Sequence, residues 1–325
     1  MLTIQDLKSK FESLHGIVEL IGVSVNYTVS DALIPRERVV EVASHYLGDD
    51  LAKLVPTKTE KSCVSRAVKE AAKTNGRFND KLARKVADTG EKAVYGVISE
   101  TRDENAEHNS YEQGSTLKLD KKEKTVTAEG ESAEKLMELY QQYTQGITDE
   151  DIRSFCVRVM RSAKGVAKNP SGSEYIVPIG YAGILDGLDA FLRDLGIGRT
   201  FPTAMINDEI SMTNTWEAAK RVIKNEVDST MQNIDNITRQ QAGLRNRQNK
   251  LSDLTNLAKI YGELTEASSE AEELAEMINN QSDAVAERIA KVQQLSVERK
   301  IARAKAAKDA LENQDDDDTQ DQDDE

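Results

Sequence analysis

The stretch NKLSDLTNLAKIYGELTEASSEAEELAEMINNQSDAVAERI, residues 249–289, decides the fold of the last third of the chain. Its apolar residues recur at steps of three and four, which is the spacing of one helix face. The same region lacks helix breakers, because no proline follows Pro202 and the only later glycines are Gly243 and Gly262. We therefore expect a helical extension over residues 209–311.

The apolar positions of this extension fall into two frames. A first seam with a 4-3 alternation contains Ile223, Val227, Ile234, Ile237, Leu244 and Leu251. A second seam, in a shifted frame, runs from Leu257 to Leu295. The shift predicts either a helical hairpin, with one helix ending near Glu266 and the next beginning at Glu270, or one continuous helix with a stutter. An exposed first seam would leave a large apolar stripe in water, which predicts self-association or a protein partner.

The chain closes on an acidic run. Nine of the 57 acidic side chains lie in the last fourteen residues, so these residues account for most of the net charge of −14. Such a segment has no apolar residues to bury, and we expect residues 312–325 to form a disordered acidic tail.

Residues 1–208 have the pattern of one α+β globular domain. Alternating apolar residues predict antiparallel strands at 82–86, 93–98, 117–119 and 125–128, and helical spacing returns at 132–143. Thr148 with the three acids that follow it predicts a helix start. The expected fold is therefore a mixed helix and antiparallel-sheet domain, followed by a helical hairpin or coiled coil and the acidic tail.

Motifs that carry chemistry are missing from the sequence. It contains neither a G-x-G-x-x-G nor a G-x-x-x-x-G-K-[ST] loop, and its histidines, His15, His45 and His108, stand alone. We expect no cofactor, no metal site and no catalytic residues, and hence no enzyme. Cys63 and Cys156 lie in apolar-periodic segments and are expected to be buried free thiols. No segment is long and apolar enough to cross a bilayer, so we expect a cytoplasmic protein without a membrane partner.

Two groups of basic residues offer an alternative function, as sites for nucleic-acid phosphate. The first group lies on the predicted helix after Thr148 and on the hairpin that follows, a layout found in winged-helix modules: Arg158, Arg161, Lys164 and Lys168. The second group lies near the end of the helical extension: Arg299, Lys300 and Arg303. Each group is also explained as a solvated basic face, and the acidic tail could compete with nucleic acid for the second group.

One resemblance places the chain in a biological setting. The stretch from Asn169 to Pro178, NPSGSEYIVP, resembles the S-G-G-x-Y-F-V-P signature of an uncharacterised family carried by phages and mobile elements. The chain departs from that signature at its second glycine and at its phenylalanine. The resemblance extends over about residues 30–208, implies a phage or plasmid setting, and implies no activity.

These observations together predict a non-enzymatic interaction or scaffold protein that forms homo-oligomers or holds a protein partner through its helical extension. The alternative prediction is a nucleic-acid-binding accessory protein with an autoinhibitory acidic tail.

Overall fold

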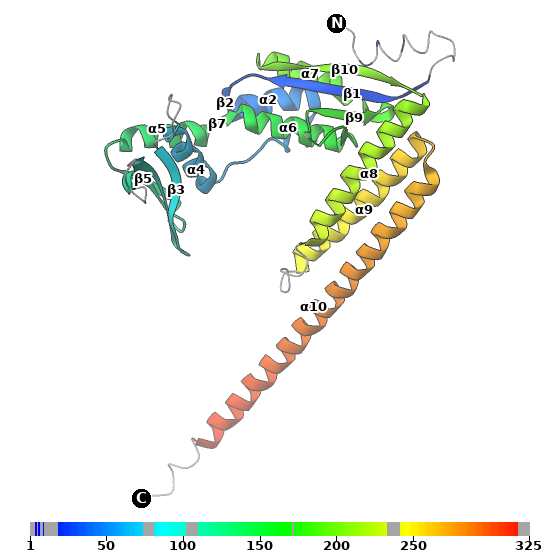
Figure 1. Ribbon diagram of the computed structural model, residues 1–325. Helices are drawn as coiled ribbons and strands as arrows, with labels where there is room; N and C mark the ends of the chain where they lie inside the picture. Colours follow the sequence, from blue (N-terminus) through cyan, green and yellow to red (C-terminus); the bar gives the residue numbers. More distant parts are fainter. Residues whose placement is uncertain are drawn as a thin grey trace, which may run out of the picture.

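The computed structural model describes residues 19–73, 81–101, 110–170, 172–232 and 241–317, together with residues 4, 6 and 9. It is a mixed α+β protein whose sheets are antiparallel, as the sequence predicts. The buried apolar residues form three clusters, one in the central part of the chain, one in an inserted lobe and one around the C-terminal helices. Figure 1 shows the lobe on one side and the long helices extending away from the central sheet.

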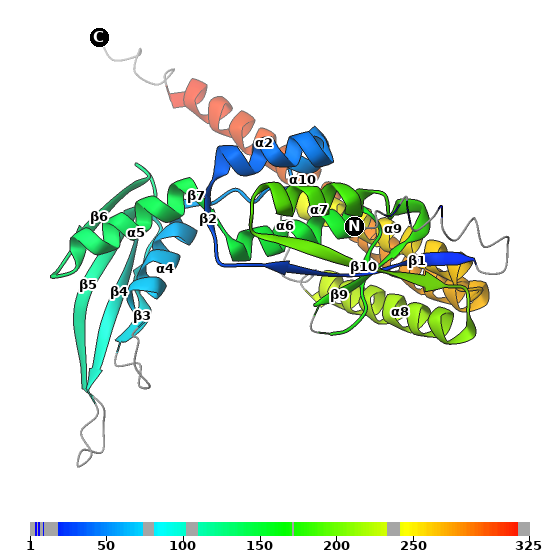
Figure 2. The same cartoon turned by 90° about the horizontal axis from the view of Figure 1, so that it is seen from above.

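The central sheet contains four strands in the order β10-β1-β9-β8. These are β1 (Leu20–Val29), β8 (Val166–Ala167), β9 (Glu174–Pro178) and β10 (Gly198–Ile206). Val23, Val25 and Val177 pack on one face, in the cluster to which helices α2 (Arg36–Leu47), α6 (Asp149–Ser162) and α7 (Ile184–Asp194) contribute. Ile176, on β9 beside Val177, belongs instead to the cluster of the C-terminal helices. The sheet is therefore covered by helices on both faces (Figure 2).

Helix α6 begins where the sequence predicts. The side chain of Thr148 accepts a hydrogen bond from the backbone N–H of Asp151, and the Asp151 carboxylate accepts one from the backbone N–H of Thr148. This reciprocal capping satisfies two of the free N–H groups at the helix start. Its apolar face is fully buried, and the ring of Phe155 packs at a tilt of 56° against the ring of Phe191 of α7.

The inserted lobe has its own core. It consists of α4 (Glu60–Ala71), β3 (Lys81–Asp88), β4 (Lys92–Thr101), β5 (Ser110–Asp120), β6 (Thr125–Glu129) and α5 (Ala133–Gln145). The four strands pair in sequence order, so the predicted antiparallel strands are confirmed. Two further short strands, β2 (Leu33–Pro35) and β7 (Gly146–Thr148), pair where the chain returns from the lobe. The short elements α3 (Asp49–Ala52) and the 3-10 turn η1 (Ile179–Tyr181) complete the central part.

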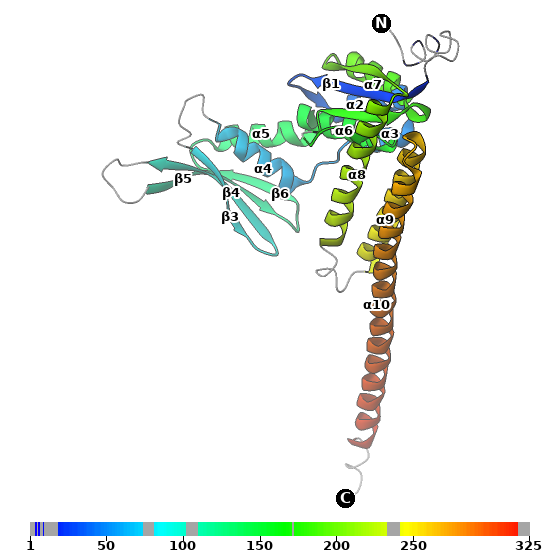
Figure 3. The same ribbon diagram turned by 45° about the vertical axis from the view of Figure 1, so that its right-hand side comes forward.

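Three helices make up the C-terminal part: α8 (Glu209–Gln232), α9 (Gln241–Leu264) and α10 (Ser268–Asp317). Residues 265–267 separate α9 from α10, and Glu266 there has a left-handed backbone with φ of 55°. The two helices lie side by side (Figures 1 and 3) and approach most closely at Gly262, where an added Cβ would lie 2.2 Å from the Cβ of Ala271. Helix α10 begins at Ser268, two residues before the predicted start at Glu270.

The described residues of the expected oligomer seam are buried within a single chain, whereas the sequence pattern predicted an exposed stripe. Ile223 and Val227 of α8 and Leu244 and Leu251 of α9 are at most 3% exposed in a single chain, where they share one core with α10. Ile234 and Ile237 lie outside the described residues. The first seam is therefore not an exposed stripe: α8 and α9 pack against each other, and this contact covers the four described residues.

Candidate functional site

Helix α10 is twice as long as the helix that supports it. Its 50 residues extend about 75 Å, whereas the 24 residues of α9 extend about 36 Å. Figure 1 shows α10 running past the lower end of α9. The last well-covered apolar residues are Val285, 1% exposed, and Ile289, 8% exposed. We call residues 293–317 the free half of α10.

The free half carries exposed apolar residues. Leu295, Val297 and Ile301 are 52%, 55% and 63% exposed. The spacing of Val297 and Ile301 continues at Ala304, Lys308 and Leu311, which is a new 4-3 stripe separate from the face that meets α9. The predicted basic residues Arg299, Lys300 and Arg303 lie on this half as well. Helix α10 continues to Asp317, so the expected tail 312–325 begins within the helix, and residues 318–325 lie outside the described part.

The first predicted basic group does not form one open face. Arg158 donates to the carbonyl of Leu54 at 3.1 Å, and Lys168 forms an ion pair with Glu174 at 2.6 Å. Arg161 pairs with Glu226 of α8 at 3.4 Å. Lys164 alone of the four has no ion pair or hydrogen bond from its side chain within the described residues.

The hairpin of this group is not the free wing of a winged-helix module. Strand β9 pairs with β1, so β8 and β9 form the edge of the central sheet, and α8 packs against β8. Arg221 of α8 donates from Nη2 to the carbonyls of Ala167 and Lys168, at 3.1 and 2.8 Å. The hairpin is therefore held by a helix on one side.

A cavity of about 620 Å³ lies at this sheet edge, between the end of α6, the β8–β9 hairpin, α8 and α9. It brings together Arg161 and Lys164, which the sequence singled out, with Arg221 and Lys250, which it did not. Glu226 forms ion pairs with Arg161 at 3.4 Å and with Lys250 at 2.5 Å. Sequence spacing alone misses this arrangement, because Glu226 and Lys250 meet only when α8 and α9 fold back on each other.

Lys164 occupies an unusual backbone position at the mouth of this cavity. Helix α6 ends in a Schellman turn, in which Gly165 N–H donates to Met160 O and Lys164 N–H donates to Arg161 O. Lys164 has a φ of 60°, in the left-handed region that favours glycine. The hydroxyl of Tyr261, a fully buried residue of α9, lies 2.9 Å from the Lys164 carbonyl oxygen. The turn is thus fixed by its own hydrogen bonds and by α9.

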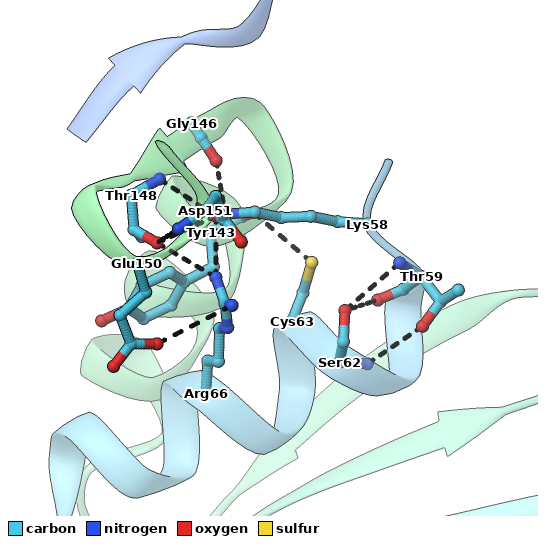
Figure 4. Close-up of polar contacts among 10 residues, drawn as sticks. All are labelled: Lys58, Thr59, Ser62, Cys63, Arg66, Tyr143, Gly146, Thr148, Glu150 and Asp151. Atoms are coloured by element: carbon cyan, nitrogen blue, oxygen red, sulfur yellow. Dashed lines mark hydrogen bonds and ion pairs between the residues drawn. The ribbon is translucent and has the colours of Figure 1, made fainter. Parts of the chain in front are cut away.

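A second polar cluster lies where the inserted lobe joins the central part (Figure 4). The Asp151 carboxylate, 7% exposed, is 2.9 Å from Lys58 Nζ and 2.8 Å from Arg66 Nη1. Lys58 also donates to the carbonyl of Gly146 at 2.6 Å. Burial acts to raise the pKa of Asp151, but hydrogen bonds from Arg66, Lys58 and Thr148 lower it well below its usual range.

This junction cluster lacks the features of a nucleophilic site. Burial raises the pKa of the Cys63 thiol, which donates a hydrogen bond to Tyr143 O at 3.4 Å. The thiol therefore stays protonated near neutral pH and is a poor nucleophile. Each charge is satisfied by a neighbour on another element, which makes the cluster a structural link between the lobe and α6.

Within the described ranges, no three His, Cys, Asp or Glu side chains lie close enough together to hold a metal ion. None of the helices in those ranges combines the length and the apolar character needed to cross a membrane.

Comparison with known proteins gives one match. No curated protein and no solved structure matches the chain. A family model described as "Family of unknown function (DUF6744)" matches residues 20–308, which include the central sheet, the inserted lobe and most of the three C-terminal helices. The chain therefore belongs to DUF6744, a family of unknown function.

Proposed function

We propose that this protein is a non-enzymatic interaction protein that self-associates through the free half of α10. The observation that carries the proposal is the exposure of Val297 and Ile301 on a helix that has left its support. Most helical stability in proteins comes from packing of an apolar face, and an exposed apolar stripe is usually covered by a partner.

The charge pattern favours a second copy, in the antiparallel direction. The five basic residues of the free half all lie between Arg299 and Lys308, and acids follow from Asp309 to Asp317. When Ile301 of one copy is placed opposite Leu311 of the second copy, the basic stretch 299–308 of each copy lies level with the start of the acidic stretch of the other. A parallel pair would instead place like charges side by side, which destabilises a helix pair.

The same pairing supplies what the acidic end lacks. Acids at a helix C-terminus are unfavourable with respect to the helix dipole, and nearby cations offset this effect. In the antiparallel pair each acidic end lies beside the basic stretch of the other copy. The two-fold symmetry closes the assembly at two chains.

Mass in solution tests the proposal, measured by sedimentation equilibrium over a range of protein concentrations. We expect a dimer for the full chain and a dimer affinity weakened by about a hundredfold or more for Ile301→Asp, because a carboxylate in a packed seam costs roughly 3 kcal/mol or more. Leu295→Asp is the matched control: it is similarly exposed but lies on the opposite side of the helix from the stripe. It should leave the dimer intact.

A charge swap tests the direction. Arg303→Glu should weaken the dimer, because it adds an acid level with the acidic stretch of the other copy, and adding Asp309→Arg in the same chain should offset that loss. A full chain that stays monomeric at high concentration, or equal effects of Ile301→Asp and Leu295→Asp, would overturn the proposal.

The alternative function, nucleic-acid binding by Arg299, Lys300 and Arg303, predicts a different result. Labelled DNA and RNA would then bind with a steep dependence on salt, and deleting residues 313–325 would strengthen that binding. Self-association predicts that this deletion leaves the dimer, since Asp309 and Glu312 remain. The proposal of self-association also includes a coiled-coil pairing, an acidic tail, a cytoplasmic location and a phage or plasmid setting.

A further inference from the structure

The cavity at the sheet edge has no role in the proposed self-association, because it lies beside β8 and far along the chain from the free half of α10. Four cations line it, Arg161, Lys164, Arg221 and Lys250, against two acids, Glu226 and Asp253. Its volume of about 620 Å³ falls in the range of small-molecule sites, about 300–1,000 Å³.

The helix dipole accounts for only part of this charge. Arg161 and Lys164 lie at the C-terminal end of α6, where cations are favoured with no ligand present. Arg221 and Lys250 come from α8 and α9, and neither lies in the last turn of its helix. Three helices therefore contribute cations to one cavity.

The cavity also has apolar lining residues. Val222 of α8 and Leu254 and Leu257 of α9 line it, with Tyr175 of β9. Tyr175 is 5% exposed, and its hydroxyl has no hydrogen bond within the described ranges. A ligand that fits both the basic and the apolar lining residues carries negative charge at one end and a flat apolar ring with polar edges at the other.

We propose that this cavity binds a nucleoside phosphate, with the phosphate at Lys164 and Arg161 and the base against Leu254 and Leu257. Lys164 is the side chain without a partner, and ammonium groups bind phosphate as point charges. Glu226 forms ion pairs with Arg161 and Lys250, and these ion pairs reduce the positive charge that is available to the phosphate. Here the phosphate is bound by side chains and not by the glycine-rich loops that the sequence lacks.

The backbone at Lys164 offers a test that separates binding from folding. Lys164→Gly removes the cation and places glycine where φ is 60°, so the turn is retained. Glu226→Gln keeps the shape of the side chain and releases the charge of Arg161 and Lys250. A merely structural role for these residues predicts no gain of affinity in any variant.

The experiment is calorimetric titration of the full chain with adenosine monophosphate, cytidine monophosphate, adenosine and inorganic phosphate. We expect the two monophosphates to bind more tightly than adenosine or phosphate, Lys164→Gly to weaken their binding at least tenfold, and Glu226→Gln to strengthen it severalfold. A short 5′-phosphorylated single strand distinguishes a free nucleotide from a strand end. Binding of the strand alone, lost in Lys164→Gly, would assign the cavity to strand ends.

Three results would overturn the inference. They are no binding of any probe at millimolar concentration, equal affinity for inorganic phosphate and the monophosphates, and unchanged affinity in Lys164→Gly. None of them bears on the dimer, since the sedimentation variants lie on α10 and the titration variants lie on α6 and α8.

Discussion

The two halves of helix α10 have the same backbone and opposite surroundings. In the half beside α9, Ile278 is fully buried and Val285 is 1% exposed, whereas in the free half Ile301 is 63% exposed. Composition does not separate them, because both contain large aliphatic residues at helical spacing. The difference comes from what lies alongside, and it separates the apolar residues that the fold buries from those that it leaves exposed.

The sharpest way to break this comparison is to place the same charge in each half. Ile278→Asp should lower the free energy of unfolding by about 4 kcal/mol or more, because a buried carboxylate has no partner there. Ile301→Asp should change it by about 0.5 kcal/mol or less in the monomer. Urea unfolding at low protein concentration measures both, and similar losses would mean that the two halves are not packed differently.

The second largest loss of unfolding free energy is expected from a change to the buried charges where the lobe joins the central part. Asp151→Asn leaves Lys58, 8% exposed, without its carboxylate, and breaking such a pair costs about 3–5 kcal/mol. The pKa of Asp151 is lowered in the folded protein, so its contribution is present above the unfolded value of about 4 and is lost as pH falls below it. The difference in unfolding free energy between the wild type and Asp151→Asn should therefore shrink between about pH 4 and pH 2. A constant difference would contradict the assignment.

Local structure was largely predictable from the sequence, because local rules decide it. Thr148 and Asp151 form a reciprocal cap at the predicted helix start, and alternation located the strands of the inserted lobe. Strand order was not predictable, since Leu20 pairs with Ile206 across nearly the whole central region. No short-range sequence pattern predicts a pairing between two strands that lie so far apart in the sequence.

The cavity shows the same limit. Sequence reasoning placed Arg161 and Lys164 together, just before a hairpin, but missed Arg221 and Lys250. The heptad frame of Ile223 and Leu251 fitted one continuous helix as well as two packed ones, because both arrangements bury the same side of the chain. Only the reversal between α8 and α9 brings Lys250 to Glu226.

A third change probes how tightly the packed half of α10 lies on α9. Gly262→Ala would place a Cβ 2.2 Å from the Cβ of Ala271, so the two helices must separate. Overpacking costs about 1–3 kcal/mol, and the better helix propensity of alanine returns about 1, which leaves a net loss of up to about 2 kcal/mol. Thermal unfolding measures it. Ala271→Gly in the same chain should recover most of the loss, and Gly183→Ala, which meets no atom within 4 Å, should stay near wild type.

The smallest expected effect concerns a residue that packing does not require. Lys164 has the left-handed φ of 60°, which costs a non-glycine residue about 1–2 kcal/mol, while glycine loses about 0.5–1 kcal/mol more on folding. Loss of a cation at the end of α6 removes roughly 0.3–1 kcal/mol. These contributions leave Lys164→Gly about as stable as wild type or more stable by about 0.5 kcal/mol. Lys164→Ala loses the charge and keeps the strain, so it should be less stable than the glycine variant by about 0.5–1 kcal/mol in urea unfolding. If the glycine variant is instead less stable than wild type by well over about 1 kcal/mol, the lysine stabilises the turn itself, and its place in the cavity needs no ligand to explain it.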